Sequence, residues 1–149
     1  MTIYLGADHR GFNLKERIKK ILKEQGYEVV DLGNTSYDEK DDYPDFAAAV
    51  AKKVGLEFDK ARGILICASG VGVDVVANKY PKVRSALAIS SDQIYDARHD
   101  DDANVLSLAA DFVDEEDAEK IVKVFLETPF AGDERYKRRL RKISEIEGQ

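Results

Sequence analysis

The stretch Gly63-Ile64-Leu65-Ile66-Cys67-Ala68-Ser69-Gly70-Val71-Gly72 decides the fold of this chain. Its first half is apolar without alternation, which is typical of a strand that helices cover on both faces of a parallel sheet. Its second half contains two glycines and leads into a helical pattern that extends to Lys79. A buried strand that passes through a short turn into a helix predicts the centre of an α/β sheet.

Short apolar runs alternate with helical patterns on both sides of this stretch. Strands are expected at 2–7, 28–32, 63–67, 85–89 and 104–108. One helix ends at Gly26, one is capped by Asp45, one runs to Lys79, and others cover 92–99, 115–128 and 133–147. Because crossovers between parallel strands are right-handed, we expect a Rossmann-like three-layer α/β/α sandwich with a five-stranded parallel sheet, in one domain of residues 1–149. Ligands of such sheets bind beyond the carboxyl ends of the strands.

Composition limits the classes of partner and cofactor. The 149 residues, 44% of them hydrophobic, leave room for one core, and the net charge of −6 disfavours nucleic acid and membrane surfaces as partners. The chain has neither an apolar run of about 18 residues nor a basic leader, so we expect a cytoplasmic protein. The single cysteine, Cys67, excludes an internal disulfide, and two histidines are too few for a cysteine/histidine zinc cluster. We therefore expect no metal and no cofactor.

The turn after the first strand combines an acid, an imidazole and a guanidinium in Asp8-His9-Arg10, between two glycines. Glycines permit close approach of the backbone to a ligand, and this turn faces the ligand crevice of the predicted fold. The alternative is a charged turn in which Asp8 caps the first helix. The cap and the site can coexist.

The turn after the central strand places Cys67 directly before the start of a helix. Free N–H groups and the helix dipole at such a position stabilise an oxyanion or a phosphate and favour a thiolate, which can act as a base. The alternative is a buried structural cysteine. The glycine spacing matches neither a Walker loop nor a dinucleotide fingerprint, so ATP and NAD are not expected.

Two further clusters lie later in the chain. In Arg98-His99-Asp100-Asp101-Asp102, repulsion between adjacent carboxylates could raise the pKa of one of them, and the alternatives are a solvated turn or a weak divalent-ion site. In the last helix, Arg135 and Arg139 are four residues apart and share a face, where they could clamp a phosphate. The alternative for this helix is a solvated basic surface.

Several segments in chain order carry a resemblance to a known family: 6–15 (GADHRGFNLK), 42–47 (DYPDFA), 63–72 (GILICASGVG) and 77–79 (ANK). Through them the chain resembles the type B ribose-5-phosphate isomerases, whose relatives act on galactose 6-phosphate and allose 6-phosphate. Residues 102–106 and 135–143 continue the match, so the resemblance covers nearly the whole chain. Val73 stands where another branch carries a catalytic glutamate, which places this chain in the cysteine branch.

The family interconverts an aldose phosphate and its ketose without a metal, through a cis-enediolate. The resemblance implies this reaction here, on ribose 5-phosphate in the pentose phosphate pathway, with Cys67 as the base. It implies roles for further residues: N–H donors in the turn of Ala68, Ser69, Gly70, Val71 and Gly72, phosphate ligands in His9, Arg10, Arg135 and Arg139, and contacts to the sugar from Asp8 and Tyr43. Family members are dimers or tetramers with the site between two subunits, so we expect a homodimer in which the fourth-helix turn or the C-terminal arginines serve a neighbour's site.

The chain departs from the family at two places. Where the family reads Arg-x-His-Asn-Asp-Ala-Asn, the ring-opening histidine falls on Asp100 and the asparagine on Asp101. Either Asp100 is the acid, with a raised pKa, or a local shift brings in His99, and we favour Asp100. Asp111 replaces an arginine with which some members bind phosphate. The alternatives are therefore the same chemistry on a six-carbon or uncommon sugar phosphate, or a phosphosugar-binding domain without catalysis.

Overall fold

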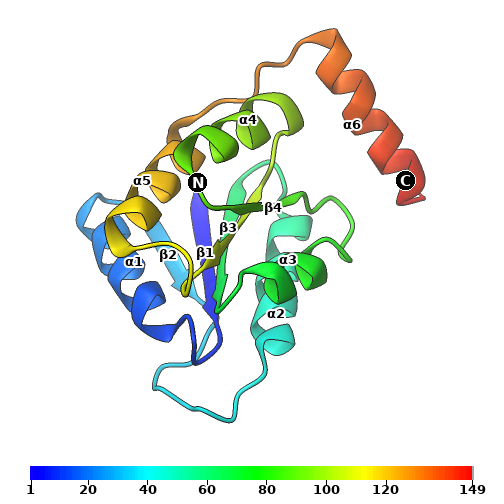
Figure 1. The fold of residues 1–149 in the computed structure, drawn as a ribbon. Helices are drawn as coiled ribbons and strands as arrows, with labels where there is room; N and C mark the ends of the chain where they lie inside the picture. Colours follow the sequence, from blue (N-terminus) through cyan, green and yellow to red (C-terminus); the bar gives the residue numbers. More distant parts are fainter. Residues whose placement is uncertain (149) are drawn as a thin grey trace.

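A computed structural model describes residues 1–148 and has the expected alternation of strands and helices (Figure 1). The strands are β1 (Thr2–Ala7), β2 (Glu28–Asp31), β3 (Ala61–Cys67), β4 (Ser85–Ala88) and β5 (Val105–Ala109). The helices are α1 (Phe12–Glu24), α2 (Tyr43–Leu56), α3 (Val71–Ala77), α4 (Ser91–Asp101), α5 (Glu115–Glu127) and α6 (Glu134–Ile146). All five strands are parallel, in the order β2-β1-β3-β5-β4, so the Rossmann-like three-layer prediction is confirmed.

The central strand β3 has helices on both of its faces, because its side chains alternate between two buried cores. Ile64 and Ile66 point into a core that α1, α4 and α5 close, whereas Leu65 and Cys67 point into a second core under α2 and α3. Both faces are apolar, which explains why the sequence of this strand shows no alternation.

Element ends differ from the expected positions by a few residues. The second helix begins at Tyr43, with Asp42 rather than Asp45 at its N-cap. Helix α3 ends at Ala77, two residues before the expected Lys79, and has only seven residues. None of the helices within residues 1–148 has both the length and the apolar character needed to cross a bilayer.

Helix α6 projects from the body of the molecule, beyond the end of α4 (Figure 1). Of its residues, only Tyr136 is buried, and Ile143 and Ile146 are 38% and 86% exposed. Most of this helix therefore lacks a hydrophobic partner within the described chain.

Candidate functional site

Cys67 is the last residue of β3 and is 4% exposed. Its carbonyl accepts the N–H of Ala110 at 2.9 Å, and the carbonyl of Ala68 accepts the N–H of Asp111 at 3.0 Å. These bonds continue the pairing of β3 with the chain of β5 beyond the strand ends. The thiol is therefore held at the carboxyl edge of the sheet, at its centre.

Two glycines allow other elements to pack closely on the turn after Cys67. Gly70 has a φ of +72°, and a Cβ there would collide with the side chain of Leu87. A Cβ on Gly72 would lie 2.6 Å from the ring of Tyr43. The Tyr43 ring therefore lies directly on the first turn of α3, beside the segment that carries the thiol.

The N–H groups at the start of α3 are the hydrogen-bond donors of this turn. The N–H of Val71 donates to Oγ of Ser69 at 3.3 Å. The N–H groups of Gly72 and Val73 lie in the first turn of α3, where an N–H group has no acceptor within the helix. Because α3 is short, we attribute any stabilisation of an anion here to these donors rather than to a long helix dipole.

The turn after β1 lies beside this segment. A Cβ on Gly11 would be 2.5 Å from the carbonyl oxygen of Ile66, so the start of α1 packs on the end of β3. Oδ1 of the buried Asp8 accepts the N–H groups of Arg10 at 3.0 Å and Gly11 at 3.1 Å. Asp8 thus closes the turn ahead of the helix, whose N-cap residue Gly11 has no side-chain bond.

His9 is bound by Asp41, from the loop between β2 and α2. One carboxylate oxygen of Asp41 accepts the backbone N–H of His9 at 2.9 Å and lies 2.7 Å from its ring Nδ1. The hydrogen bond to Asp41 raises the pKa of His9, and the charge of Asp8 adds to this while that of Arg10 opposes it. The pairing favours the imidazolium and leaves Nε2 available to an anionic ligand.

Arg10 forms an ion pair with Asp111, the residue that departs from the family pattern. The guanidinium and the carboxylate are 2.5 Å apart, and both side chains are about half exposed. The pair joins the ends of β1 and β5, which flank β3, so it bridges the edge at which Cys67 lies. Asp111 therefore offsets part of the positive charge that Arg10 brings to this edge.

His99, Asp100 and the arginines of α6 form a second cluster. Nδ1 of His99 is 2.7 Å from Oδ1 of Asp100, and the His99 ring meets that of Tyr136 edge-on. The guanidinium groups of Arg135 and Arg139 lie 4.5 and 5.7 Å from the centre of the Tyr136 ring. The structure therefore brings the fourth-helix turn and both arginines of α6 together, although they are far apart in the sequence.

The expectation that Asp100 has a raised pKa is wrong. Hydrogen bonds from His99 and then from Tyr136 lower the pKa of Asp100. Repulsion among the three carboxylates is relieved because Asp102 is paired with Arg84 and Arg98, while Asp101 is exposed. Asp100 is therefore the acceptor that orients His99, and its ionised form is the favoured one.

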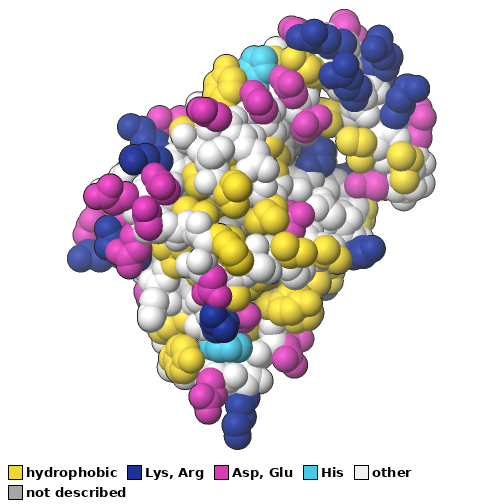
Figure 2. All heavy atoms as spheres, in the orientation of Figure 1, with side chains coloured by type: hydrophobic (Ala, Val, Ile, Leu, Met, Phe, Trp, Pro, Cys, Tyr) yellow, Lys and Arg dark blue, Asp and Glu magenta, His cyan; other side chains and the backbone are white. Residues whose placement is uncertain are grey.

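The two clusters lie at opposite ends of the sheet. Helix α4 returns from the carboxyl end of β4 to the amino end of β5, where Arg84 donates to the carbonyls of Asp101 and Asp102. Cys67 lies at the carboxyl end of β3. The chain has two histidines, and Figure 2 shows them at opposite ends of the visible face. One chain therefore unites Asp8, His9, Arg10, Tyr43 and the turn 67–72, but does not bring His99, Asp100, Asp101, Arg135 or Arg139 to them.

Asp41 is a site residue that the sequence did not single out. It lies in the acidic loop between β2 and α2, where residues 35–40 are exposed but the side chain of Asp41 is 6% exposed. The signal that could have singled it out is its position directly before the DYP segment, although four acids in this loop look alike. Asp8, His9 and Asp41 could offer a cation three ligand atoms within 4.8 Å of one another, but the hydrogen bonds above already engage Asp8 and Asp41.

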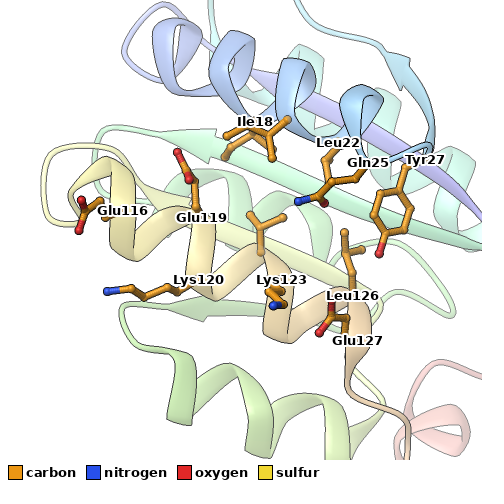
Figure 3. A pocket seen from close by; sticks show the side chains of 12 residues that line it. Ile18, Leu22, Gln25, Tyr27, Glu116, Glu119, Lys120, Lys123, Leu126 and Glu127 are labelled. Carbon is orange, nitrogen blue, oxygen red and sulfur yellow. The ribbon is translucent and has the colours of Figure 1, made fainter.

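A hollow of about 380 Å³ between α1 and α5 lies away from these groups (Figure 3). Its floor is apolar, with Ile18, Leu22 and Leu126, and its rim holds charged side chains such as Glu119 and Lys123. Helices α1 and α5 cover the face of the sheet opposite to that of Cys67. We therefore locate the candidate site at the Cys67 edge and not in this hollow.

Comparisons with known proteins identify the family of this chain. Residues 3–143 match the family described as Ribose/Galactose Isomerase. Ribose-5-phosphate isomerase B of Mycobacterium tuberculosis is 37% identical over 147 residues, which are 99% of this chain and 90% of that protein. The crystal structure of ribose-5-phosphate isomerase B from Mycoplasma genitalium with bound ribulose 5-phosphate has a TM-score of 0.96 at 45% identity, over 99% of this chain and 97% of that one. The structure of ribose-5-phosphate isomerase B from Clostridium thermocellum has a TM-score of 0.94 at 42% identity, over 99% of this chain and 98% of that one. This chain belongs to the ribose/galactose isomerase family.

Proposed function

We propose that this protein interconverts ribose 5-phosphate and ribulose 5-phosphate, with Cys67 as the base. The observation that carries the proposal is the thiol itself, held at the carboxyl edge between the His9 turn and the Tyr43 ring in a chain of this family. The relative from Mycoplasma genitalium, which has ribulose 5-phosphate bound, supports the choice of substrate. A free thiol with this role suits a reducing compartment, and we place the protein in the cytoplasm.

The reaction needs one base and donors to two oxygens. The thiolate of Cys67 removes the proton from C2 of the open-chain aldose, and the electrons of that C–H bond form the C1–C2 double bond of an enediolate. N–H groups of the turn 68–72 donate to its oxygens, and one proton passes from O2 to O1. Return of the proton from sulfur to C1 gives the ketose and restores the thiolate, so no metal or electron acceptor is consumed.

Substrate binding divides between the ends of the molecule. Asp8 and Tyr43 lie next to the thiol and line the sugar, and His9 and Arg10 face the phosphate from the same edge. Arg135 and Arg139 supply the planar donors that a phosphate prefers, but they lie at the other end of the chain. A second copy that places its α6 and α4 end beside Cys67 would complete the site.

An apolar surface next to the site supports a homodimer. Hydrophobic side chains gather over α3 and the ends of β4 and β5 (Figure 2). They include Val71, Val75, Ile89 and Phe112, which are 50% to 75% exposed. An exposed apolar patch beside an incomplete site is typical of an interface. In the dimer, we assign opening of the sugar ring to His99 of the neighbouring subunit, oriented by its Asp100.

A panel of sugar phosphates tests the substrate. Ribose 5-phosphate, galactose 6-phosphate and allose 6-phosphate are each incubated with the protein and EDTA, and aldose and ketose are separated and measured. We expect the highest kcat/KM for ribose 5-phosphate and no effect of the chelator. A higher kcat/KM for a six-carbon phosphate would favour the alternative that Asp111 suggests. Binding without turnover of any aldose phosphate would reject the enzyme assignment.

A further inference from the structure

A chain of hydrogen bonds runs from the buried interior of the protein to His9. It begins at Lys15, whose side chain is wholly buried although it carries a charge. Its ammonium group lies 2.8 Å from Oδ2 and 2.9 Å from Oδ1 of Asp31, and it donates to the backbone carbonyl of Asn34 at 2.7 Å. A buried lysine with these partners fixes both the end of β2 and the start of the following loop.

The next links lie within that loop. The side-chain amide of Asn34 donates to Oδ2 of Asp41 at 2.5 Å, so this oxygen of the carboxylate is fixed by a residue of the same loop. Its other oxygen accepts the backbone N–H of His9 and binds the ring at Nδ1. Asp41 therefore sets both the position of the imidazole and the nitrogen that is left free.

We propose that Asp41 is a positioning residue for His9, held in place by Asn34 and through it by the buried ammonium of Lys15. The inference rests on the proposed role of His9 as a phosphate ligand. Asp41 touches the imidazole and lies behind it, so it acts on the substrate only through the ring. Its carboxylate keeps the ring protonated and turns Nε2–H toward the anion.

The consequence for pH follows from the groups that face the ring. Asp41 and, more weakly, Asp8 raise the pKa of His9, Arg10 lowers it, and Tyr37 contributes a ring edge at 6.2 Å between centroids. The imidazolium therefore persists to higher pH than that of an isolated histidine. An Asp41→Asn substitution keeps the shape of the side chain but removes its charge, so His9 should lose its proton, and with it phosphate affinity, at lower pH.

The test joins NMR titration with kinetics. The chain has two histidines, so a His9→Gln variant assigns their resonances. In Asp41→Asn we expect the titration midpoint of His9 to fall and KM to begin its rise at correspondingly lower pH, with kcat changed less than twofold. Asn34→Ala removes the hydrogen bond to only one carboxylate oxygen of Asp41. It should shift the His9 midpoint and the pH at which KM rises in the same direction as Asp41→Asn, but less. Glu39→Gln, an exposed acid of the same loop, is the matched control and should behave as the wild type.

Different results would reject different parts of the account. An unchanged His9 midpoint in Asp41→Asn overturns the inference, and so does an unchanged KM profile in a variant whose midpoint has moved. If His9→Gln itself retains the wild-type KM, the proposed role of His9 as a phosphate ligand fails, whether or not the His9 midpoint moves in Asp41→Asn. Adding Asp41→Asn to His9→Gln should not raise KM further, because Asp41 acts through the ring. Near-ultraviolet circular dichroism of each variant checks that the fold is retained.

Discussion

At neutral pH the carboxyl group of Asp100 is ionised, because His99 and Tyr136 donate hydrogen bonds to it and lower its pKa. An ionised carboxylate cannot donate the proton that the oxygen of a sugar ring needs when the ring opens. It can hold His99 by Nδ1, with Nε2 free for proton transfer. In this pair His99 is the group that can transfer a proton, and Asp100 is the carboxylate that orients it.

This division of roles predicts how two substitutions differ. His99→Gln should lower the turnover of cyclic ribose 5-phosphate by about 100-fold, because general acid–base catalysis contributes on that order, and Asp100→Asn should lower it less. Erythrose 4-phosphate cannot form a furanose ring, since its O4 is esterified. Proton exchange at its C2 should be nearly unaffected by either change. Equal losses on both sugars would reject a role in ring opening.

Residue type and order predicted the Cys67 turn and the Asp8-His9-Arg10 turn, because each follows directly from a strand end. They could not predict the chemistry of Asp100. Whether adjacent carboxylates raise one another's pKa depends on which cations and donors they meet. His99 and Arg98 are neighbours in the sequence, but Arg84 and Tyr136 come from parts of the chain that only the fold brings to this turn.

At the scale of elements, the buried Lys15 connects α1 to β2 and to the loop that follows. Asp31, its partner, is itself largely buried, and although burial alone would raise the pKa of Asp31, hydrogen bonds from Lys15 and Lys19 lower it. The ion pair therefore joins two elements at a point where an uncompensated charge is costly.

A Lys15→Met substitution should destabilise the protein by about 2–4 kcal/mol, because it leaves Asp31 with Lys19 as its one ammonium partner in a partly buried position. Urea denaturation measures this as a lower midpoint at an unchanged m-value. Lys20→Met, on the exposed side of the same helix, is the control and should change stability by less than about 0.5 kcal/mol. Equal midpoints for the two variants would show that the buried pair contributes nothing to stability.

The elements themselves were predictable to within a few residues. Periodicity located all five strands and the helices between them, because burial on one face or on two faces leaves a clear pattern in the sequence. The order of the strands was not predictable from that pattern. It depends on which crossovers pass over which neighbours, as the position of β5 between β3 and β4 illustrates.

At the scale of the whole molecule, the proposed site needs two chains. The thiol edge and the cluster of His99, Asp100, Arg135 and Arg139 lie at opposite ends of one sheet, and α6 leaves most of its surface unpacked (Figure 1). A symmetric dimer would repeat the same pairing twice, with each subunit supplying the thiol of one site and the arginines of the other.

Complementation between inactive variants tests this arrangement. Cys67→Ala and the double variant Arg135→Ala/Arg139→Ala should each be inactive. When they are unfolded together and refolded in equal amounts, half of the dimers are mixed and each mixed dimer has one intact site. We therefore expect about a quarter of the wild-type activity. Light scattering should show a dimer or a larger assembly in every sample. A mixture that stays inactive, although mixed dimers form, would place the whole site within one chain.

The central claim is that Cys67 exchanges a proton with the substrate without a metal. It is tested most directly by incubating ribose 5-phosphate with the protein in deuterated water with EDTA, and following deuterium at C1 and C2 by NMR. We predict ribulose 5-phosphate labelled with deuterium at C1 for the wild type, and loss of both turnover and exchange for Cys67→Ala. Wild-type turnover and exchange in Cys67→Ala would contradict the account.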